Sequence, residues 1–281
     1  VHNMSHQGVF PREVLGALGL PESLFTIDGV EYHGAVGFLK AGLALSDRLT
    51  TVSPTYAREL MTPAFGMGLD GLLRARAGVL EGVLNGIDTE VWNPATDPVL
   101  PAPYSAADPS GKAGSRAALC ARFDIPEPEG PLCGVVSRFA WQKGLDLVPD
   151  ALPALEGEGG ALVMLGAGEA ELEARFDGLA RARAGRLAVH VGYDEDLAHL
   201  LQAGCDALLV PSRFEPCGLT QLCALRYGTA PVVARTGGLA DTVIDATPAA
   251  LAVGAATGIL HDPGSSDALA GALRRPARRS S

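Results

Sequence analysis

Between residues 132 and 274 the sequence alternates regularly between short apolar runs and amphipathic stretches, and this alternation constrains the fold more than any other feature. The apolar runs are rich in Val, Leu and Ala, as is typical of strands that are buried on both faces. They cover residues 132–138, 161–166, 186–192, 206–211, 230–236 and 258–262. The stretches with helical spacing cover residues 144–155, 169–184, 195–204, 219–227, 239–246 and 265–274. Strict alternation predicts an α/β fold with a doubly wound parallel sheet, whose ligands bind beyond the carboxyl ends of the strands.

The first 86 residues have a more mixed pattern. Helical spacing is present at residues 12–18, 36–47 and 53–60, and strand-like runs at residues 1–3, 48–52 and 79–86. Ser53 is the expected N-cap of its helix, with Pro54 as the first helical residue, where its missing N–H costs nothing. The pair Asn85-Gly86 predicts a turn.

Residues 87–111 are dense in Pro, Asp, Ala and Ser and show little periodicity, so they predict a connector. We therefore expect two domains, residues 1–86 and residues 87–281, with the connector at the start of the second.

Composition narrows the class of protein. Of the 281 residues, 47% are hydrophobic and 19% are charged, which is a globular composition without a run long enough to span a membrane. The net charge of −10 argues against a nucleic-acid or anionic-membrane partner, and the basic tail 274–281 is best explained as a solvated terminus. The five cysteines are scattered, without metal-ligand spacing, and predict reduced thiols in a cytoplasmic protein. The histidines have no ligand spacing either, so no metal site is predicted.

The first candidate loop follows the strand at 132–138. Arg138 closes that strand and Lys143 precedes the next helix. Two cations at this position suit a diphosphate, because Arg binds phosphate bidentately and Lys acts as a compact charge. Either residue alone would be interpreted as an ordinary surface cation, but the pair favours a binding function.

The second candidate loop is "SRFEPCGLTQ", residues 212–221. Glu215 either caps the following helix or accepts hydrogen bonds from ligand hydroxyls, and Pro216 makes simple capping awkward. Gly218 allows a close approach of the backbone to a ligand, and the helix beginning at Leu219 and Thr220 directs its N–H groups to the same crevice. No base or metal ligand accompanies Cys217, so it is not predicted to be a nucleophile.

Two weaker signals come from other strand ends. Thr236, Gly237 and Gly238 would allow a phosphate or sugar to lie against the backbone. A tight turn between strand and helix explains the same residues nearly as well. Tyr193 could stack on a base, and an equally good interpretation is a half-exposed aromatic side chain without a binding role.

Several of these segments occur in the order found in one family. They include "TVSPTYARE" (51–59), "GVLNGIDTEVWNP" (82–94), "VVSRFAWQKGLDL" (135–147), "VPSRFEPCGLTQL" (210–222) and "YGTAPVVARTGGLADTV" (227–243). Because it contains these segments in this order, the chain resembles the bacterial and plant-type glycogen (starch) synthases. The resemblance implies the GT-B fold, with two Rossmann-like doubly wound domains of which the N-terminal one is incomplete.

The resemblance also implies site residues. The catalytic set is Arg138, Lys143, Glu215 and His2. Arg138 and Lys143 would bind the donor diphosphate and stabilise it as it leaves, Glu215 would lie against the donor glucose, and His2 would approach the transferred glucose from the N-terminal domain. The substrate-binding set is Asn85, Tyr193, Cys217, Gly218, Leu219, Thr220, Thr236, Gly237 and Gly238. Within that set the resemblance implies that Asn85 would lie on the hinge side of the cleft, that Tyr193 would pack on the adenine, and that residues 236–238 would form the phosphate-side loop.

The activity implied by the family is retaining transfer of glucose from a nucleotide-diphosphate glucose, with ADP-glucose expected, to the non-reducing end of an α-1,4-glucan, without a cofactor. The residues themselves leave the donor base open between adenine and uracil. A double displacement needs two carboxylates about 5 Å apart. Position 223, where many related glycosyltransferases carry a second Glu, is a Cys here. We therefore expect direct transfer with retained configuration.

The sequence also departs from the family. It contains no Lys-x-Gly-Gly loop and ends in a basic tail, so it is expected to be a fragment that lacks this N-terminal region and the C-terminal helices. An exposed sheet edge would then favour self-association, that is, a homo-oligomer. The alternative function is a truncated module that binds nucleotide or glucan without turnover. A sugar-nucleotide epimerase is disfavoured by the segments "EPCGLTQ" and "VLNGID".

Overall fold

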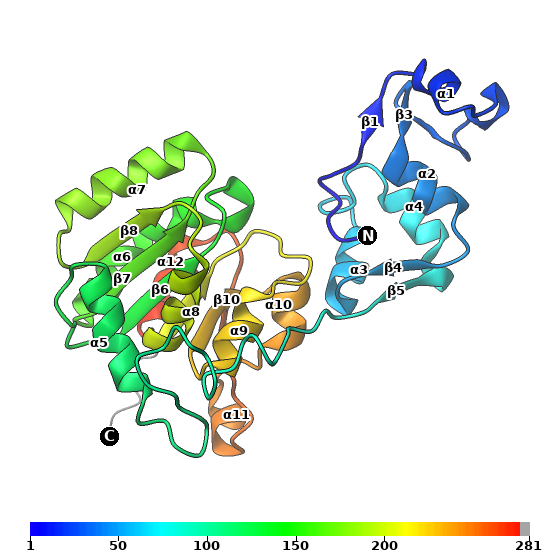
Figure 1. Ribbon diagram of the computed structural model, residues 1–281. Coiled ribbons are helices and arrows are strands. Elements are labelled where there is room, and N and C mark those ends of the chain that lie inside the picture. The colour runs from blue at the N-terminus through cyan, green and yellow to red at the C-terminus, as the bar shows by residue number, and fades with distance from the viewer. Residues whose placement is uncertain (276–281) are drawn as a thin grey trace. The chain divides into compact units, whose positions relative to one another are not determined.

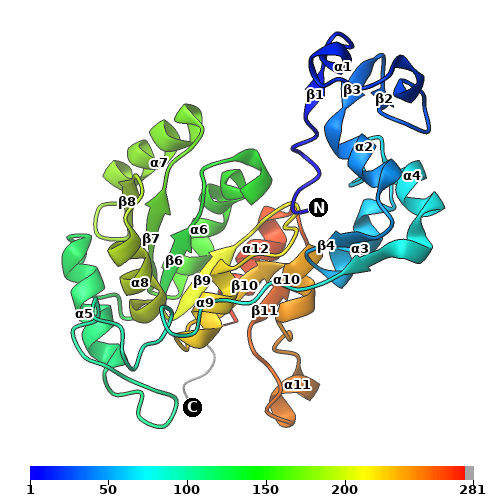
Figure 2. The same cartoon turned by 45° about the vertical axis from the view of Figure 1, so that its right-hand side comes forward.

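The computed structural model describes residues 1–275 of the chain. The chain separates into two compact units, Val1–Asn85 and a second unit that begins at Gly86 (Figures 1 and 2). Among the described residues, no helix combines the length and the apolar character needed to cross a membrane.

The second unit is built on a six-stranded, wholly parallel sheet with the strand order β11-β10-β9-β6-β7-β8. Its strands are β6 (Leu132–Val136), β7 (Ala161–Gly166), β8 (Leu187–Val191), β9 (Ala207–Val210), β10 (Ala230–Ala234) and β11 (Ile259–His261). The chain runs outward from β6 through β7 to β8, then returns to place β9 on the other side of β6. This reversal creates a topological switch point between β6 and β9.

Helices cover both faces of this sheet (Figure 1). They are α5 (Lys112–Arg122), α6 (Val148–Gly157), α7 (Ala170–Ala182), α8 (Glu195–Gly204), α9 (Thr220–Arg226), α10 (Gly237–Thr242), α11 (Pro248–Ala252) and α12 (Ser266–Leu273). Leu162 and Met164 of β7 belong to a core shared with α6, α7 and α12, whereas the neighbouring Val163 belongs to a core shared with α5 and α8. Alternate residues are thus buried on opposite faces, which is why the strands are apolar throughout and why the predicted doubly wound sheet is confirmed.

Several predicted boundaries in this unit were wrong. The helix predicted at 144–155 begins only at Val148, because Trp141–Lys143 and Leu145–Leu147 form two 3₁₀ turns. Gly144 between them has φ 64°, and a Cβ there would lie 2.0 Å from the carbonyl oxygen of Pro211. The helix predicted at 239–246 begins earlier, at Gly237, and ends at Thr242. Helices α5 and α11 were not predicted.

The connector has no helix or strand, yet buried side chains anchor it to the second unit. Asp97 accepts hydrogen bonds from Tyr227 Oη at 2.5 Å and pairs with His199 Nδ1 at 2.7 Å. Trp92 stacks on the His199 ring at 4.0 Å, and Tyr104 Oη donates to the backbone oxygen of Tyr227 at 2.8 Å. The segment after Gly86 is therefore a fixed part of the unit.

The first unit contains a parallel pair and a small antiparallel sheet. The pair is β4 (Leu49–Thr51) with β5 (Leu80–Gly82), and the sheet has the order β1-β3-β2, formed by β1 (Val9–Phe10), β3 (Ala35–Gly37) and β2 (Glu31–Tyr32). Its helices are α1 (Val14–Ala17), α2 (Phe38–Leu45), α3 (Pro54–Leu60) and α4 (Asp70–Ala75), with 3₁₀ turns at Glu22–Leu24 and Ala77–Val79. The predicted cap is confirmed: Ser53 Oγ accepts from the Tyr56 N–H at 2.8 Å, and Pro54 is the first helical residue.

Other expectations for this unit were wrong. Residues 1–3 form no strand, although the Val1 amino group donates to Thr50 O at 2.6 Å. The helix predicted at 36–47 starts at Phe38, because Ala35–Gly37 is taken into the antiparallel sheet. The helix predicted at 12–18 has only four residues, and no turn forms at Asn85-Gly86.

Candidate functional site

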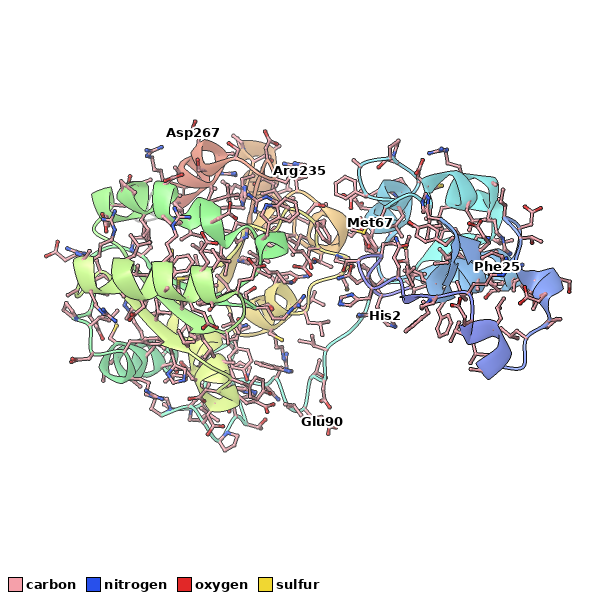
Figure 3. All side chains as sticks on the ribbon, turned by 90° about the horizontal axis from the view of Figure 1, so that it is seen from above. His2, Phe25, Met67, Glu90, Arg235 and Asp267 are labelled. Atoms are coloured by element: carbon pink, nitrogen blue, oxygen red, sulfur yellow. The ribbon has the colours of Figure 1, made fainter. Side chains whose placement is uncertain are left out.

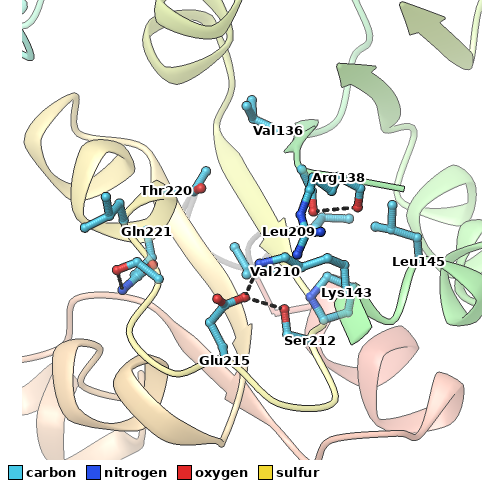
Figure 4. Close-up of a pocket in the computed structure, with 14 residues that line it drawn as sticks. Val136, Arg138, Lys143, Leu145, Leu209, Val210, Ser212, Glu215, Thr220 and Gln221 are labelled. Atoms are coloured by element: carbon cyan, nitrogen blue, oxygen red, sulfur yellow. Dashed lines mark hydrogen bonds and ion pairs between the residues drawn. The ribbon is translucent and has the colours of Figure 1, made fainter. Parts of the chain in front are cut away.

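A pocket lies at the carboxyl ends of β6 and β9, directly at the switch point of the sheet (Figure 4). Its walls come from the loop after β6, the end and following loop of β9, and the start of α9. The lining residues are Val136, Ser137, Arg138, Lys143, Leu145, Leu209, Val210, Pro211, Ser212, Glu215, Gly218, Leu219, Thr220 and Gln221. The two loops that the sequence singled out thus form one pocket.

Glu215 is the acidic residue of this pocket and is only 6% exposed. Its Oε2 accepts from Lys143 Nζ at 2.6 Å and from Ser212 Oγ at 2.9 Å (Figure 4). Helix α9 begins at Thr220, and its N-cap position, Leu219, makes no side-chain cap hydrogen bond. Glu215 is therefore not a helix cap; it is a buried carboxylate held by a cation and a hydroxyl.

Arg138 is the second cation of the pocket. Its side chain is exposed and forms no hydrogen bond or ion pair within residues 1–275. Since Lys143 and Glu215 form a neutral pair, Arg138 leaves the pocket with one uncompensated positive charge. A pocket of this charge favours an anionic ligand.

The turn at Gly218 shapes the far wall of the pocket. Gly218 has φ 72°, and a Cβ there would lie 2.4 Å from Gln221 Oε1. Gln221 Nε2 donates to the carbonyl oxygens of Cys217 at 3.1 Å and Gly218 at 2.9 Å. Leu219 is 47% exposed, whereas Cys217 is buried and lies outside the pocket lining. Gln221 therefore stabilises a backbone turn that only glycine can form without strain.

Thr236, Gly237 and Gly238 are buried and do not line the pocket. A Cβ on Gly237 would lie 1.9 Å from the Glu215 carbonyl oxygen, and one on Gly238 would lie 2.1 Å from that of Cys217. The N–H of Gly238 donates to the Glu215 carbonyl oxygen at 3.0 Å. The glycine pair thus allows β10 and α10 to support the loop that carries Glu215.

The remaining predicted residues lie elsewhere. Tyr193 follows β8, is 88% exposed and donates its hydroxyl to Glu195 at 3.2 Å. His2, labelled in Figure 3, and Asn85 are exposed residues of the first unit. The pocket itself therefore combines Arg138, Lys143, Glu215, Gly218, Leu219 and Thr220 of the predicted set.

Sequence reasoning missed three polar residues of the pocket: Ser137, Ser212 and Gln221. Each of them lies in a segment that the sequence had already singled out. Their closeness in sequence to Arg138 or Glu215 could therefore have identified them as pocket residues. Cys223 is 4% exposed and burial raises its pKa to about 12, so this thiol cannot replace a second carboxylate. Within residues 1–275 no group of His, Cys, Asp and Glu side chains could hold a metal ion.

A doubly wound sheet with a cationic pocket at its switch point is an arrangement in which α/β domains bind ligands beyond the carboxyl ends of their strands. The family model described as "Glycosyl transferases group 1" matches residues 121–276, and the model described as "Starch synthase catalytic domain" matches residues 1–75. The chain therefore belongs to the group 1 glycosyl transferases.

Individual relatives agree with this assignment. The glycogen synthase of Rhodopseudomonas palustris strain BisA53 is 60% identical over 274 residues, which are 97% of this chain and 56% of that protein. The catalytic domain of starch synthase IV from Arabidopsis thaliana, solved with ADP and acarbose, is 34% identical with a TM-score of 0.93, over 99% of this chain and 59% of that one. The predicted resemblance to glycogen and starch synthases is confirmed. The chain spans a little over half the length of these relatives.

The fold class is confirmed by the same comparisons. HepE of Anabaena, solved with UDP and glucose, is 18% identical and has a TM-score of 0.59, over 85% of this chain and 55% of that one. At this identity the likeness concerns the fold alone, and it places the chain among α/β proteins of the GT-B type.

Proposed function

We propose that this chain belongs to an enzyme that transfers glucose from a nucleotide-diphosphate glucose to the non-reducing end of an α-1,4-glucan, and that the pocket of the second unit binds the donor. The observation that carries the proposal is the arrangement of Arg138, Lys143 and Glu215 at the switch point of the sheet. The 60% sequence identity between this chain and a glycogen synthase, over 97% of the chain, supports the same function.

Arg138 and Lys143 are the proposed ligands of the diphosphate. The Arg138 side chain has no hydrogen-bond or ion-pair partner among the described residues, so phosphate binding would not require the loss of an existing ion pair. Lys143 has three donor hydrogens, so it can bind a phosphate oxygen and remain bound to Glu215. As the bond to glucose breaks, both cations would stabilise the charge that develops on the diphosphate.

Glu215 is the proposed contact to the hydroxyls of the donor glucose. Its ion pair with Lys143 makes it a poor nucleophile, and among the described residues that line the pocket it is the one carboxylate. A double displacement would need two. We therefore propose direct transfer with retention: an acceptor hydroxyl oxygen bonds to the anomeric carbon, the bond from that carbon to the diphosphate breaks, and the departing phosphate takes the hydroxyl proton.

The other predicted residues keep their proposed roles. The backbone of residues 217–220 would contact sugar and phosphate, and Thr236, Gly237 and Gly238 would form the phosphate-side loop. Tyr193 would pack on the base. His2 and Asn85 belong to the first unit, which we propose as the acceptor-side domain.

We propose ADP-glucose as the donor and an α-glucan as the acceptor. Support comes from the starch synthase IV domain, which was solved with ADP and acarbose and is 34% identical to this chain. The choice of adenine over uracil rests on this relative.

Calorimetric titration of the chain with ADP and with UDP tests donor binding, and incubation of ADP-glucose with glycogen then tests transfer. We expect tighter binding of ADP, and in a complete enzyme we expect Arg138→Ala to lower kcat about 100-fold. If neither nucleotide binds, the proposed donor site is wrong. If ADP binds and the chain transfers no glucose, these residues bind the donor without turnover, which is the alternative function.

A further inference from the structure

A second ion pair joins the two loops that form the pocket. Arg213 follows Ser212 at the end of β9, and its Nη1 and Nη2 donate to Asp146 Oδ1 and Oδ2 at 2.6 and 2.7 Å. Nη1 also donates to the Trp141 carbonyl oxygen at 2.8 Å, and the guanidinium lies 4.6 Å from the centre of the Trp141 ring. The Arg213 side chain is 18% exposed, and it does not line the pocket.

Arg213 binds residues on both sides of Lys143 in the sequence. Trp141 and Asp146 flank it in sequence, and both are bound by Arg213. The backbone adds two more links between the loops, from Arg213 N to Gln142 O at 2.9 Å and from Gln142 Nε2 to Phe214 O at 3.2 Å. Residues 141–147 form only 3₁₀ turns, which are less stable than an α-helix. The loop that carries Lys143 therefore depends on these contacts for its position.

We propose that Arg213 is a positioning residue: through Asp146 and Trp141 it holds the Lys143 loop against the Glu215 loop, and so fixes the Lys143–Glu215 pair that binds the donor. The role of that pair in donor binding rests on the function proposed above, but the positioning itself does not.

Lysine could not replace Arg213 in this arrangement. A guanidinium forms two parallel bonds to one carboxylate and stacks on an aromatic ring at the same time, whereas an ammonium is a single compact charge. The matched control is Arg116, whose side chain is 20% exposed in the same unit. It pairs with Asp206 and donates to Pro128 O and Gly130 O, and it also lies outside the pocket lining.

The first experiment needs no ligand. Both tryptophans, Trp92 and Trp141, belong to the second unit, so their fluorescence during urea unfolding reports that unit. Arg213→Ala, Lys143→Ala and the double variant form a thermodynamic cycle. Because Arg213 acts through the position of Lys143, we expect the double variant to lose clearly less stability than the sum of the two single losses. Additive losses would overturn the positioning role, whether or not the chain binds nucleotide.

A spectroscopic measurement accompanies the cycle. Trp141 is 58% exposed with Arg213 over its ring, so Arg213→Ala should increase the quenching of tryptophan fluorescence by acrylamide. Arg116→Ala should leave the quenching unchanged while it lowers stability to a similar extent.

The second experiment measures ADP affinity. We expect Arg213→Ala to weaken ADP binding about tenfold, Arg213→Lys to recover only part of this loss, and Arg116→Ala to leave affinity unchanged. In a Lys143→Ala background, the further loss from Arg213→Ala should be about twofold or less, because the residue it positions is gone. A full tenfold loss in that background would contradict action through Lys143. No binding of ADP by the unaltered chain would instead contradict the proposed donor site, and the ligand-free cycle would still decide the role of Arg213.

Discussion

Removal of Lys143 should destabilise the second unit even in the absence of a ligand. The Glu215 side chain is 8% exposed and that of Lys143 is 19% exposed, with 2.6 Å between Nζ and Oε2. Loss of one partner from a buried ion pair typically costs about 3–5 kcal/mol, because the other charge remains buried and uncompensated. Here Ser212 still donates to Glu215, and the shortened side chain admits water, so we expect a loss of about 2 kcal/mol for Lys143→Ala.

Urea unfolding followed by tryptophan fluorescence measures this loss in the second unit. With a slope of about 2 kcal/mol per molar urea, the midpoint should fall by about 1 M. Glu215→Gln in the Lys143→Ala background removes the uncompensated charge and should restore at least half of the lost stability. A change of less than about 0.5 kcal/mol for Lys143→Ala would refute the reasoning, because an effect of that size is typical of a solvent-exposed pair.

Four further predictions follow from single sites. Arg138→Ala should weaken ADP binding about 10- to 100-fold in calorimetry and leave the unfolding midpoint unchanged, because the side chain has no partner among the described residues. Gly237→Ala should cost at least about 2 kcal/mol in urea unfolding, because φ is 44° and the new Cβ would meet the Glu215 carbonyl oxygen; an unchanged midpoint would contradict this packing. Ser53→Ala should destabilise the first unit by about 1 kcal/mol, as measured by circular dichroism, because the Tyr56 N–H loses its acceptor. Burial lowers the pKa of Lys112 to about 8, so between pH 8 and 10.5 the unfolded chain binds more protons and stability should rise with pH; Lys112→Met should flatten that rise.

The sequence alone was sufficient for the features that depend on local signals. Six apolar runs separated by helical stretches predicted the parallel sheet, since a strand buried on both faces must be apolar throughout. Ser53-Pro54 predicted a capped helix start, because the cap bond joins residues three apart in the chain. Glu215 was singled out because it follows a buried strand and Pro216 makes simple helix capping by this carboxylate awkward.

Only the tertiary structure shows which of these residues contact one another. Lys143 and Glu215 are 72 residues apart, and their loops meet because β9 returns to lie beside β6. Only the structure shows that glycines are required at 237 and 238 by packing, because the backbone of the Glu215–Cys217 loop occupies the space where their Cβ atoms would lie. The helix predicted from residue 144 likewise begins only at Val148, because Gly144 has a left-handed φ and lies close to the Pro211 carbonyl oxygen. Composition and spacing describe each segment by itself, whereas contacts between distant segments depend on strand order and close packing, which no local pattern encodes.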